Sequence, residues 1–146
     1  MTFFHSFDDY DWESIPVLSY KEEGTHFKNI TRRVLFDGTS GIDAELRYFE
    51  ISPGGYSTLE SHKHVHQVLI LRGTGRALIG NKIFDLKPHD CFEIGPNRWH
   101  QFQASPKGPF GFLCLVKNER DRPHRPDKKE LEELHSDILI SKFIRT

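Results

Sequence analysis

Between residues 44 and 118, short apolar runs alternate with turns rich in Gly and Pro, and this alternation limits the folds open to the chain. Runs of this length, bounded by Gly, Pro, Asn and Asp, are typical of β-strands. The segments with this pattern are residues 44–51, 66–72, 76–79, 83–86, 91–94, 99–102 and 110–116. We expect Ser52-Pro53-Gly54-Gly55 to end the first strand. Many short strands with no long helix among them predict an all-β sandwich or barrel.

The two ends of the chain differ from this middle region. The first 20 residues are rich in aromatic and acidic side chains, and we expect an arm that packs on the barrel or on a partner subunit. Near the C-terminus, Asp127 and Glu130 have the spacing of a capping box that opens a helix. Leu131, Leu134 and Ile138 would share one face of that helix, suited to packing or dimerisation. The predicted parts are the arm and leading strands (1–43), the barrel core (44–118), and a linker with a short C-terminal helix (119–146).

The balance of charges narrows the class of partner. The chain has 146 residues, with Lys+Arg 20, Asp+Glu 21 and a formal net charge of -1. Since no basic excess is present, we predict a small-molecule substrate and no nucleic-acid partner. The acidic N-terminus lacks the features of a signal peptide, and no apolar run is long enough to cross a membrane, so a cytoplasmic location is expected. Cys91 and Cys114 form no CxxC pair, which favours free thiols.

Glu60, His62, His64 and His66 lie at alternate positions just before an apolar segment. In one straight strand, side chains at these positions would line one face. Neutral imidazole and carboxylate groups are common donors to divalent transition metals. A solvated polar strand is the competing interpretation, but three histidines at this spacing favour a metal site.

The segments around these residues resemble the two motifs of the cupin superfamily. The first motif is matched by Gly55 and by ESHKHVHQVLILRG, which ends at Gly73, and the second by KPHDCFEIGPNRWHQF. The resemblance covers roughly residues 44–118. It implies a double-stranded β-helix, the jelly-roll or cupin barrel, that holds one metal ion. The chain departs from the family at His89, in a turn where glycine is usual.

The resemblance also implies which side chains bind the metal. In cupin barrels the third ligand lies seven residues before the turn glycine, here Gly73, and the first two lie six and four residues before the third. With His100 from the second motif, the implied ligands are Glu60, His62, His66 and His100. The alternative pairs His62 with His64 and would put the third ligand at Val68 or Leu69, neither of which can bind a metal.

Such a ligand set would leave one or two positions open on an octahedral ion, as a catalytic metal requires. The implied cofactor is one divalent ion, with Mn²⁺ or Fe²⁺ preferred and Ni²⁺, Co²⁺ or Zn²⁺ compatible. Strand alternation places Val68 and Ile70 on the face of His66, and Phe102 on the face of His100, although Phe102 could equally be plain core. We therefore expect an apolar pocket beside the metal.

Four further side chains are candidates for the pocket or for the chemistry. Arg47 could clamp a carboxylate or phosphate, or lie in solvent on its strand. Cys114 could line the pocket, or serve only as a small buried hydrophobe. His64 is expected in the tight connection between two strands, near the mouth of the site, and Tyr48 on a strand that lines or edges the barrel. Either side chain could move a proton during catalysis.

Further segments resemble a bacterial cupin subgroup related to methylthioxylulose phosphate methylsulfurylase. They are FKNITRRVLFDG, LRYFEISPGGYSTLESHKHVH, WHQF, GFLCLV and NERDRP. Enzymes of this kind use a divalent metal and a thiol to take the methylthio group from a sugar phosphate, which makes glutathione a candidate co-substrate.

The leading functional hypothesis is therefore a metal-dependent enzyme acting on a small carbonyl or sugar-phosphate-like metabolite, by C–S cleavage, isomerisation or elimination. A mononuclear iron dioxygenase, a non-catalytic small-ligand-binding cupin and a purely structural barrel are the alternatives. Because exposed sheet edges are usually covered, we also expect a homodimer.

Overall fold

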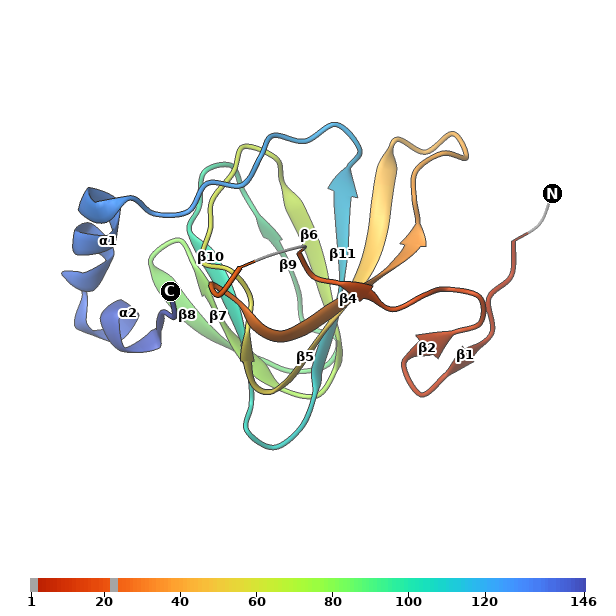
Figure 1. The fold of residues 1–146 in the computed structure, drawn as a ribbon, viewed down its shortest axis with the longest axis horizontal. Coiled ribbons are helices and arrows are strands. Elements are labelled where there is room, and N and C mark those ends of the chain that lie inside the picture. Colours follow the sequence, from red (N-terminus) through yellow and green to blue (C-terminus); the bar gives the residue numbers. More distant parts are fainter. Residues whose placement is uncertain (1–2, 22–23) are drawn as a thin grey trace.

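A curled antiparallel sheet forms the centre of the protein (Figure 1). The structure is a computed structural model that describes residues 3–21 and 24–146. Its strands are β1 (Phe7–Asp8), β2 (Asp11–Trp12), β3 (Leu18–Ser19), β4 (Lys28–Phe36), β5 (Ala44–Tyr56), β6 (His66–Arg72), β7 (Gly75–Ile79), β8 (Lys82–Leu86), β9 (Cys91–Ile94), β10 (His100–Ala104) and β11 (Phe110–Lys117). The large sheet has the order β8-β7-β10-β5-β11-β6-β9, and β4 pairs with both β3 and β5. The predicted all-β jelly roll is confirmed.

The first barrel strand is longer than the sequence pattern predicts. Residues 52–55 do not end it, and β5 continues to Tyr56, where it pairs with β4 and β10. The pairing with β4 shifts register here, because Lys28 lies opposite Tyr56 while Ile30 lies opposite Ile51. A Cβ on Gly55 would lie 2.6 Å from the carbonyl oxygen of Lys28. The glycines therefore permit a close approach within a continuous strand, where we had expected a turn.

The turn before β9 keeps the backbone shape that glycine would give. His89 has a φ of 76°, in the left-handed region that non-glycine residues seldom adopt. Its amide donates to the carbonyl of Ile70, and Asp90 accepts from the amide of Lys87. These bonds hold His89 in a backbone conformation that glycine adopts more readily.

Apolar side chains from both halves of the curled sheet fill the barrel. Phe102 and Phe112 stack with 4.5 Å between ring centroids, and Phe49 stacks on Phe112 at 5.5 Å. Val68 and Ile70 belong to the same buried cluster, as strand alternation predicts. Cys91 is exposed and Cys114 buried, and both are free thiols.

The C-terminal segment folds as two short helices instead of the predicted one: α1 (Lys128–His135) and α2 (Ile138–Phe143). The capping box of Asp127 and Glu130 is present, so the predicted start is confirmed. The placement of Ile138 on the face of Leu134 is wrong, because Asp137 caps a second helix and Ile138 is 67% exposed. The two helices bury Leu134, Ile140 and Phe143 in a separate cluster with Leu59 and Leu78.

The N-terminal arm lies on the other side of the barrel from these helices (Figure 1). Its hairpin, β1 and β2, packs through Trp12 against Tyr48 of β5, with 5.1 Å between the rings. Arg33 of β4 pairs with Asp11 at 3.3 Å. The arm therefore packs on the barrel of its own chain.

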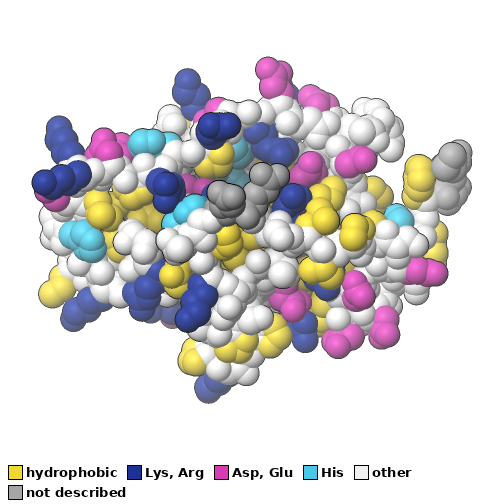
Figure 2. All heavy atoms as spheres, viewed as in Figure 1, with side chains coloured by type: hydrophobic (Ala, Val, Ile, Leu, Met, Phe, Trp, Pro, Cys, Tyr) yellow, Lys and Arg dark blue, Asp and Glu magenta, His cyan; other side chains and the backbone are white. Residues whose placement is uncertain are grey.

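On the face drawn in Figure 2, Lys and Arg side chains are interspersed with Asp and Glu. This mixture agrees with the even balance of charges in the sequence. Within residues 3–21 and 24–146, no helix combines the length and apolar composition that a membrane crossing requires.

Candidate metal centre

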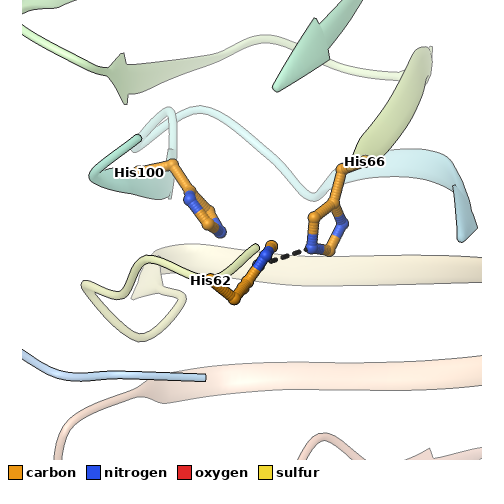
Figure 3. A group of neighbouring side chains, drawn as sticks. All are labelled: His62, His66 and His100. Carbon is orange, nitrogen blue, oxygen red and sulfur yellow. Dashed lines mark hydrogen bonds between the residues drawn. The ribbon is translucent and has the colours of Figure 1, made fainter. Parts of the chain in front are cut away.

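Three histidines from separate parts of the chain converge inside the barrel (Figure 3). His66 begins β6, His100 begins β10, and His62 lies in the connection between β5 and β6. One ligand nitrogen from each ring lies within 4.8 Å of the others. This separation allows one ion to contact all three side chains.

Backbone hydrogen bonds bring the connection of His62 against β10. The amide of Glu60 donates to the carbonyl of His100 at 3.2 Å, and the amide of His100 donates to the carbonyl of Glu60 at 3.0 Å. The amide of Asn97 donates to the carbonyl of His62 at 2.7 Å. The stretch that holds His62 and His64 is therefore a bent connection anchored to β10. These positions do not form one straight strand, and His64 lies in the connection between β5 and β6.

The Nδ1 atoms of the three histidines are already engaged. His62 Nδ1 lies 2.8 Å from the carbonyl oxygen of His64, and His100 Nδ1 lies 2.9 Å from that of Arg98. A carbonyl can only accept, so Nδ1 carries the proton in both rings and Nε2 keeps a lone pair. His66 Nδ1 lies 2.7 Å from Cys114 Sγ, while its Nε2 faces His62 Nε2 at 2.8 Å. Such outer hydrogen bonds are how proteins orient histidine ligands.

Burial keeps these imidazoles neutral. It lowers the pKa of His62 from 6.5 to about 4, with His100 and His64 adding to the shift. Burial, followed by the neighbouring His100 and His62, also holds the pKa of His66 well below its ordinary value. The pKa of His100 is lowered by burial against the opposing carbonyl of Arg98. Neutral imidazole is the form that binds a metal, so the residues fit a divalent ion.

Glu60 lies beside the histidines but outside their group of three. Its carboxylate is buried, at 7% exposure, and Oε2 accepts from Lys21 Nζ at 2.8 Å. Coordination through Glu60 would therefore use Oε1, or share Oε2 with Lys21. Its role as a fourth ligand stays a prediction.

The histidines open into a cavity of about 340 Å³, within the range of small-molecule sites. Of the side chains predicted for the pocket, the cavity wall includes Arg47, Val68, Phe102 and Cys114. Ile70 is fully buried in the core and does not line the wall. The lining combines three phenylalanines, Phe49, Phe102 and Phe112, with several charged side chains.

His64 also lines this cavity, although it is not among the three converging ligands. Its ring stacks on that of His62, with 3.6 Å between centroids. Its Nδ1 lies 2.8 Å from Asp121 Oδ1, and Asp121 also accepts from the amides of Lys63 and His64. The Lys63 amide, with the His64 ring and amide, holds the pKa of Asp121 well below its ordinary value. Asp121 therefore fixes both the bend and the ring of His64.

Tyr48 lies elsewhere. It is fully buried on the opposite face of β5, where its hydroxyl donates to Glu50 at 2.8 Å, and it does not line the cavity. A Cβ at Gly111 would collide with this hydroxyl. Adjacent residues of a strand point to opposite faces, so Tyr48 points outward because Arg47 points inward. Its placement gives no support to the proton-transfer role predicted for it.

Several cavity residues were not identified from the sequence. They are Tyr20, Lys21, Arg32, Glu45, Arg120 and Asp121. Arg120 and Asp121 belong to the NERDRP segment, so the subgroup resemblance held a signal for them. Arg32 belongs likewise to the FKNITRRVLFDG segment, whereas Tyr20, Lys21 and Glu45 carry no local pattern that distinguishes them from ordinary strand and arm residues.

The comparisons with known proteins agree with this geometry. Residues 47–116 match the family model described as the cupin domain. The chain is 45% identical over 136 residues to 1-methylthio-D-xylulose 5-phosphate methylsulfurylase of Rhodospirillum rubrum, covering 92% of this chain and 86% of that one.

Two crystal structures share the fold at similar identity. A cupin 2 conserved barrel domain protein from Rhodopseudomonas palustris matches with a TM-score of 0.93 and 41% identity, over 98% of this chain and 99% of that chain. A cupin-2 domain protein from Rhodospirillum rubrum matches with a TM-score of 0.87 and 42% identity, over 97% and 95%. Because the matched segment contains all three converging histidines and the likeness extends over nearly the whole chain, the protein belongs to the cupin family.

Proposed function

We propose that the protein is a metal-dependent enzyme that removes the methylthio group from a 1-methylthio-pentulose 5-phosphate, with a soluble thiol as acceptor. The observation that carries the proposal is the group of three buried, neutral imidazoles that opens into a cavity sized for a small metabolite. The name of the 45% identical relative supplies the substrate class.

In this proposal His62, His66 and His100 hold the ion, with Glu60 as the predicted fourth ligand. Mn²⁺ or Fe²⁺ remains the preferred ion, with Ni²⁺, Co²⁺ and Zn²⁺ compatible. When bound, a divalent ion supplies Lewis acidity toward the carbonyl and hydroxyl oxygens of a substrate.

The proposed reaction consumes one thiol for each substrate molecule. The sulfur of the thiolate attacks the methylthio sulfur, and the bond between that sulfur and C1 of the sugar breaks. The electron pair passes to C1, next to the carbonyl, and the proton lost by the thiol ends on C1. The products are a 1-deoxypentulose phosphate and a mixed disulfide that carries the methylthio group.

His64 is the proposed carrier of that proton. Asp121 occupies its Nδ1, so Nε2 is the ring nitrogen available to take the proton of the thiol and give it to C1. Orientation of an imidazole by a carboxylate is the usual arrangement for such a base.

The acceptor is proposed to be glutathione or a similar soluble thiol. Cys114 is only 1% exposed, and burial raises its pKa against the opposing effect of Arg47. A buried neutral thiol is a poor nucleophile. In this proposal Cys114 lines the pocket and orients His66. Assembly as a homodimer and a cytoplasmic location remain predictions from the sequence.

The test uses protein made without a His-tag and loaded with Mn²⁺ or Fe²⁺. It is incubated with 1-methylthio-D-xylulose 5-phosphate and glutathione, and both products are followed by mass spectrometry. The proposal predicts equal amounts of deoxypentulose phosphate and mixed disulfide. Absence of both would contradict the substrate, and uptake of O₂ on adding the substrate would instead support the dioxygenase alternative.

A further inference from the structure

Three arginine side chains, Arg32, Arg47 and Arg120, line the cavity wall. Glu45 lies beside two of them, Arg47 and Arg120. Glu45 Oε1 lies 3.5 Å from Arg47 Nε and 3.9 Å from Arg120 Nη2, so one carboxylate is shared at long range by two guanidinium groups. Arg32 donates instead to the backbone carbonyl of Ser19.

The remaining charges in the cavity wall nearly balance. Glu60 pairs with Lys21, while Asp121 accepts from the ring of His64, which is neutral in the proposed function. Among the described lining residues, the four cations Lys21, Arg32, Arg47 and Arg120 therefore outnumber the carboxylates Glu45, Glu60 and Asp121 and leave an excess of positive charge. A phosphate ester carries a charge of about -1.5 to -2 at neutral pH, which suits this excess.

Arg47 is more deeply buried than Arg120, whose side chain is 27% exposed. The Arg47 side chain is 13% exposed, and the buried Nε has no hydrogen-bond partner within the described part of the chain. Phe49 packs under the guanidinium, 4.9 Å from ring centroid to Cζ. A buried donor without a partner is costly to a folded protein, and such donors are rare unless a ligand completes them.

Arg47 is also connected to the histidine group. Its Nη2 lies 3.6 Å from Cys114 Sγ, and that sulfur lies 2.7 Å from Nδ1 of His66. A substrate in contact with the histidines would thus reach Arg47 within the same cavity. Planar guanidinium groups bind phosphate oxygens through two parallel N–H bonds, which a lysine cannot reproduce.

We infer that Arg47, with Arg32 and Arg120, forms the subsite for the phosphate group of the substrate and so selects phosphorylated over unphosphorylated sugars. The assignment of the ligand as a sugar phosphate rests on the proposed function. The assignment of the anion subsite rests on the charges, the burial and the Nε of Arg47, which has an ion-pair contact with Glu45 but no hydrogen bond among the described residues.

Calorimetry on the metal-loaded protein can test this inference without turnover. The probes are D-xylulose 5-phosphate and D-xylulose, which differ only in the phosphate. The parent should bind the phosphate ester at least about tenfold more tightly, and Arg47→Gln should lose most of this preference. Arg76→Gln is the matched control, because Arg76 is exposed and pairs with Asp85 outside the cavity. The control should keep the preference of the parent.

Metal content and thermal melting of each variant establish that it is folded. If Arg47→Gln fails to fold, Arg120→Gln takes its place, because Arg120 is more exposed. The measurement is again the ratio of the affinities for D-xylulose 5-phosphate and D-xylulose, and this variant should also lose most of the preference. A preference kept by the folded Arg47 variant, or by the Arg120 variant in its place, would overturn the inference. So would a parent that binds the two sugars equally or binds neither. A parent with the preference but without methylthio removal would keep the anion subsite and reject the proposed reaction.

Discussion

The two faces of β5 use polar side chains in opposite ways. On the outer face, the hydroxyl of Tyr48 and Nη1 of Arg72 both donate to Glu50, at 2.8 and 2.9 Å, and Trp12 of the arm covers them. On the inner face, Arg47 has a buried Nε without a hydrogen-bond partner among the described residues. The ring nitrogens of His62 and His66 face one another beside it.

This difference separates stabilising groups from binding groups. A buried polar network that is fully paired within the protein stabilises one arrangement and has little left to offer a ligand. Buried donors and lone pairs that lack partners reduce stability until something binds them. Both faces are rich in the residue types that suggested function, but only the inner face has unused bonding capacity.

The largest expected effect is the loss of metal binding when one of the three converging histidines is removed. We expect His62→Ala and His100→Ala to lose tight metal binding, because each removes one of three converging donors. The metal content, measured by elemental analysis of protein without a His-tag, should fall from about one ion per chain to almost none.

His64→Ala and Tyr48→Phe are the controls, and both should keep most of the metal. Equal metal loss from His64→Ala would mean that the ligand register is wrong. In His64→Ala we also expect turnover to fall by about a hundredfold or more, because the proposed proton carrier is removed.

Side chains of the metal site and of the outer face of β5 should also differ in their effect on how stability changes with pH. Burial lowers the pKa of His62 from 6.5 in the unfolded chain to about 4. The unfolded state therefore binds more protons below pH 6.5, so the metal-free protein should lose stability as pH falls from 6.5 toward 4. Each additional proton bound by the unfolded state changes the free energy of unfolding by about 1.4 kcal/mol per pH unit.

Urea unfolding in the presence of a chelator measures this slope. His62→Gln should flatten it relative to the parent, while Tyr48→Phe should leave it unchanged. An identical slope in His62→Gln and the parent would show that this imidazole is not held neutral by the fold.

Removal of the Tyr48 hydroxyl should affect stability alone. Tyr48→Phe deletes a buried hydrogen bond to Glu50, while Arg72 still pairs with that carboxylate. We expect a loss of about 1 to 2 kcal/mol in the free energy of unfolding, with unchanged metal content and turnover. A loss of turnover without a loss of stability would show that Tyr48 takes part in catalysis.

The smallest effects are expected at the two cysteines. Cys114→Ser should keep a substantial share of turnover when glutathione is supplied, because a soluble thiol is the proposed acceptor. Cys91→Ser, at an exposed position on β9, should behave like the parent. Complete loss of turnover in Cys114→Ser, with metal content unchanged, would place this thiol in the reaction.

The sequence by itself determined the positions of most barrel strands after residue 44, the family motifs and the cluster of histidines. These features depend on short-range pattern: Val68 and His66 share a face because strand side chains alternate, and Asp127 and Glu130 cap α1 because they lie three residues apart. The resemblance to the cupin motifs, counted back from Gly73, implied His62 and His66 as ligands.

Only the tertiary structure decided which face of β5 became the inside and which partners each charge found. Alternation separates Arg47 from Tyr48, but it does not say which one points into the barrel. The contacts that settle their environments join distant parts of the chain: Asp121 lies 57 residues from His64, and Lys21 lies 39 residues from Glu60. No local pattern encodes such pairs, because long-range strand pairing and the covering arm bring them together. The unpartnered Nε of Arg47 is likewise a property of the closed barrel.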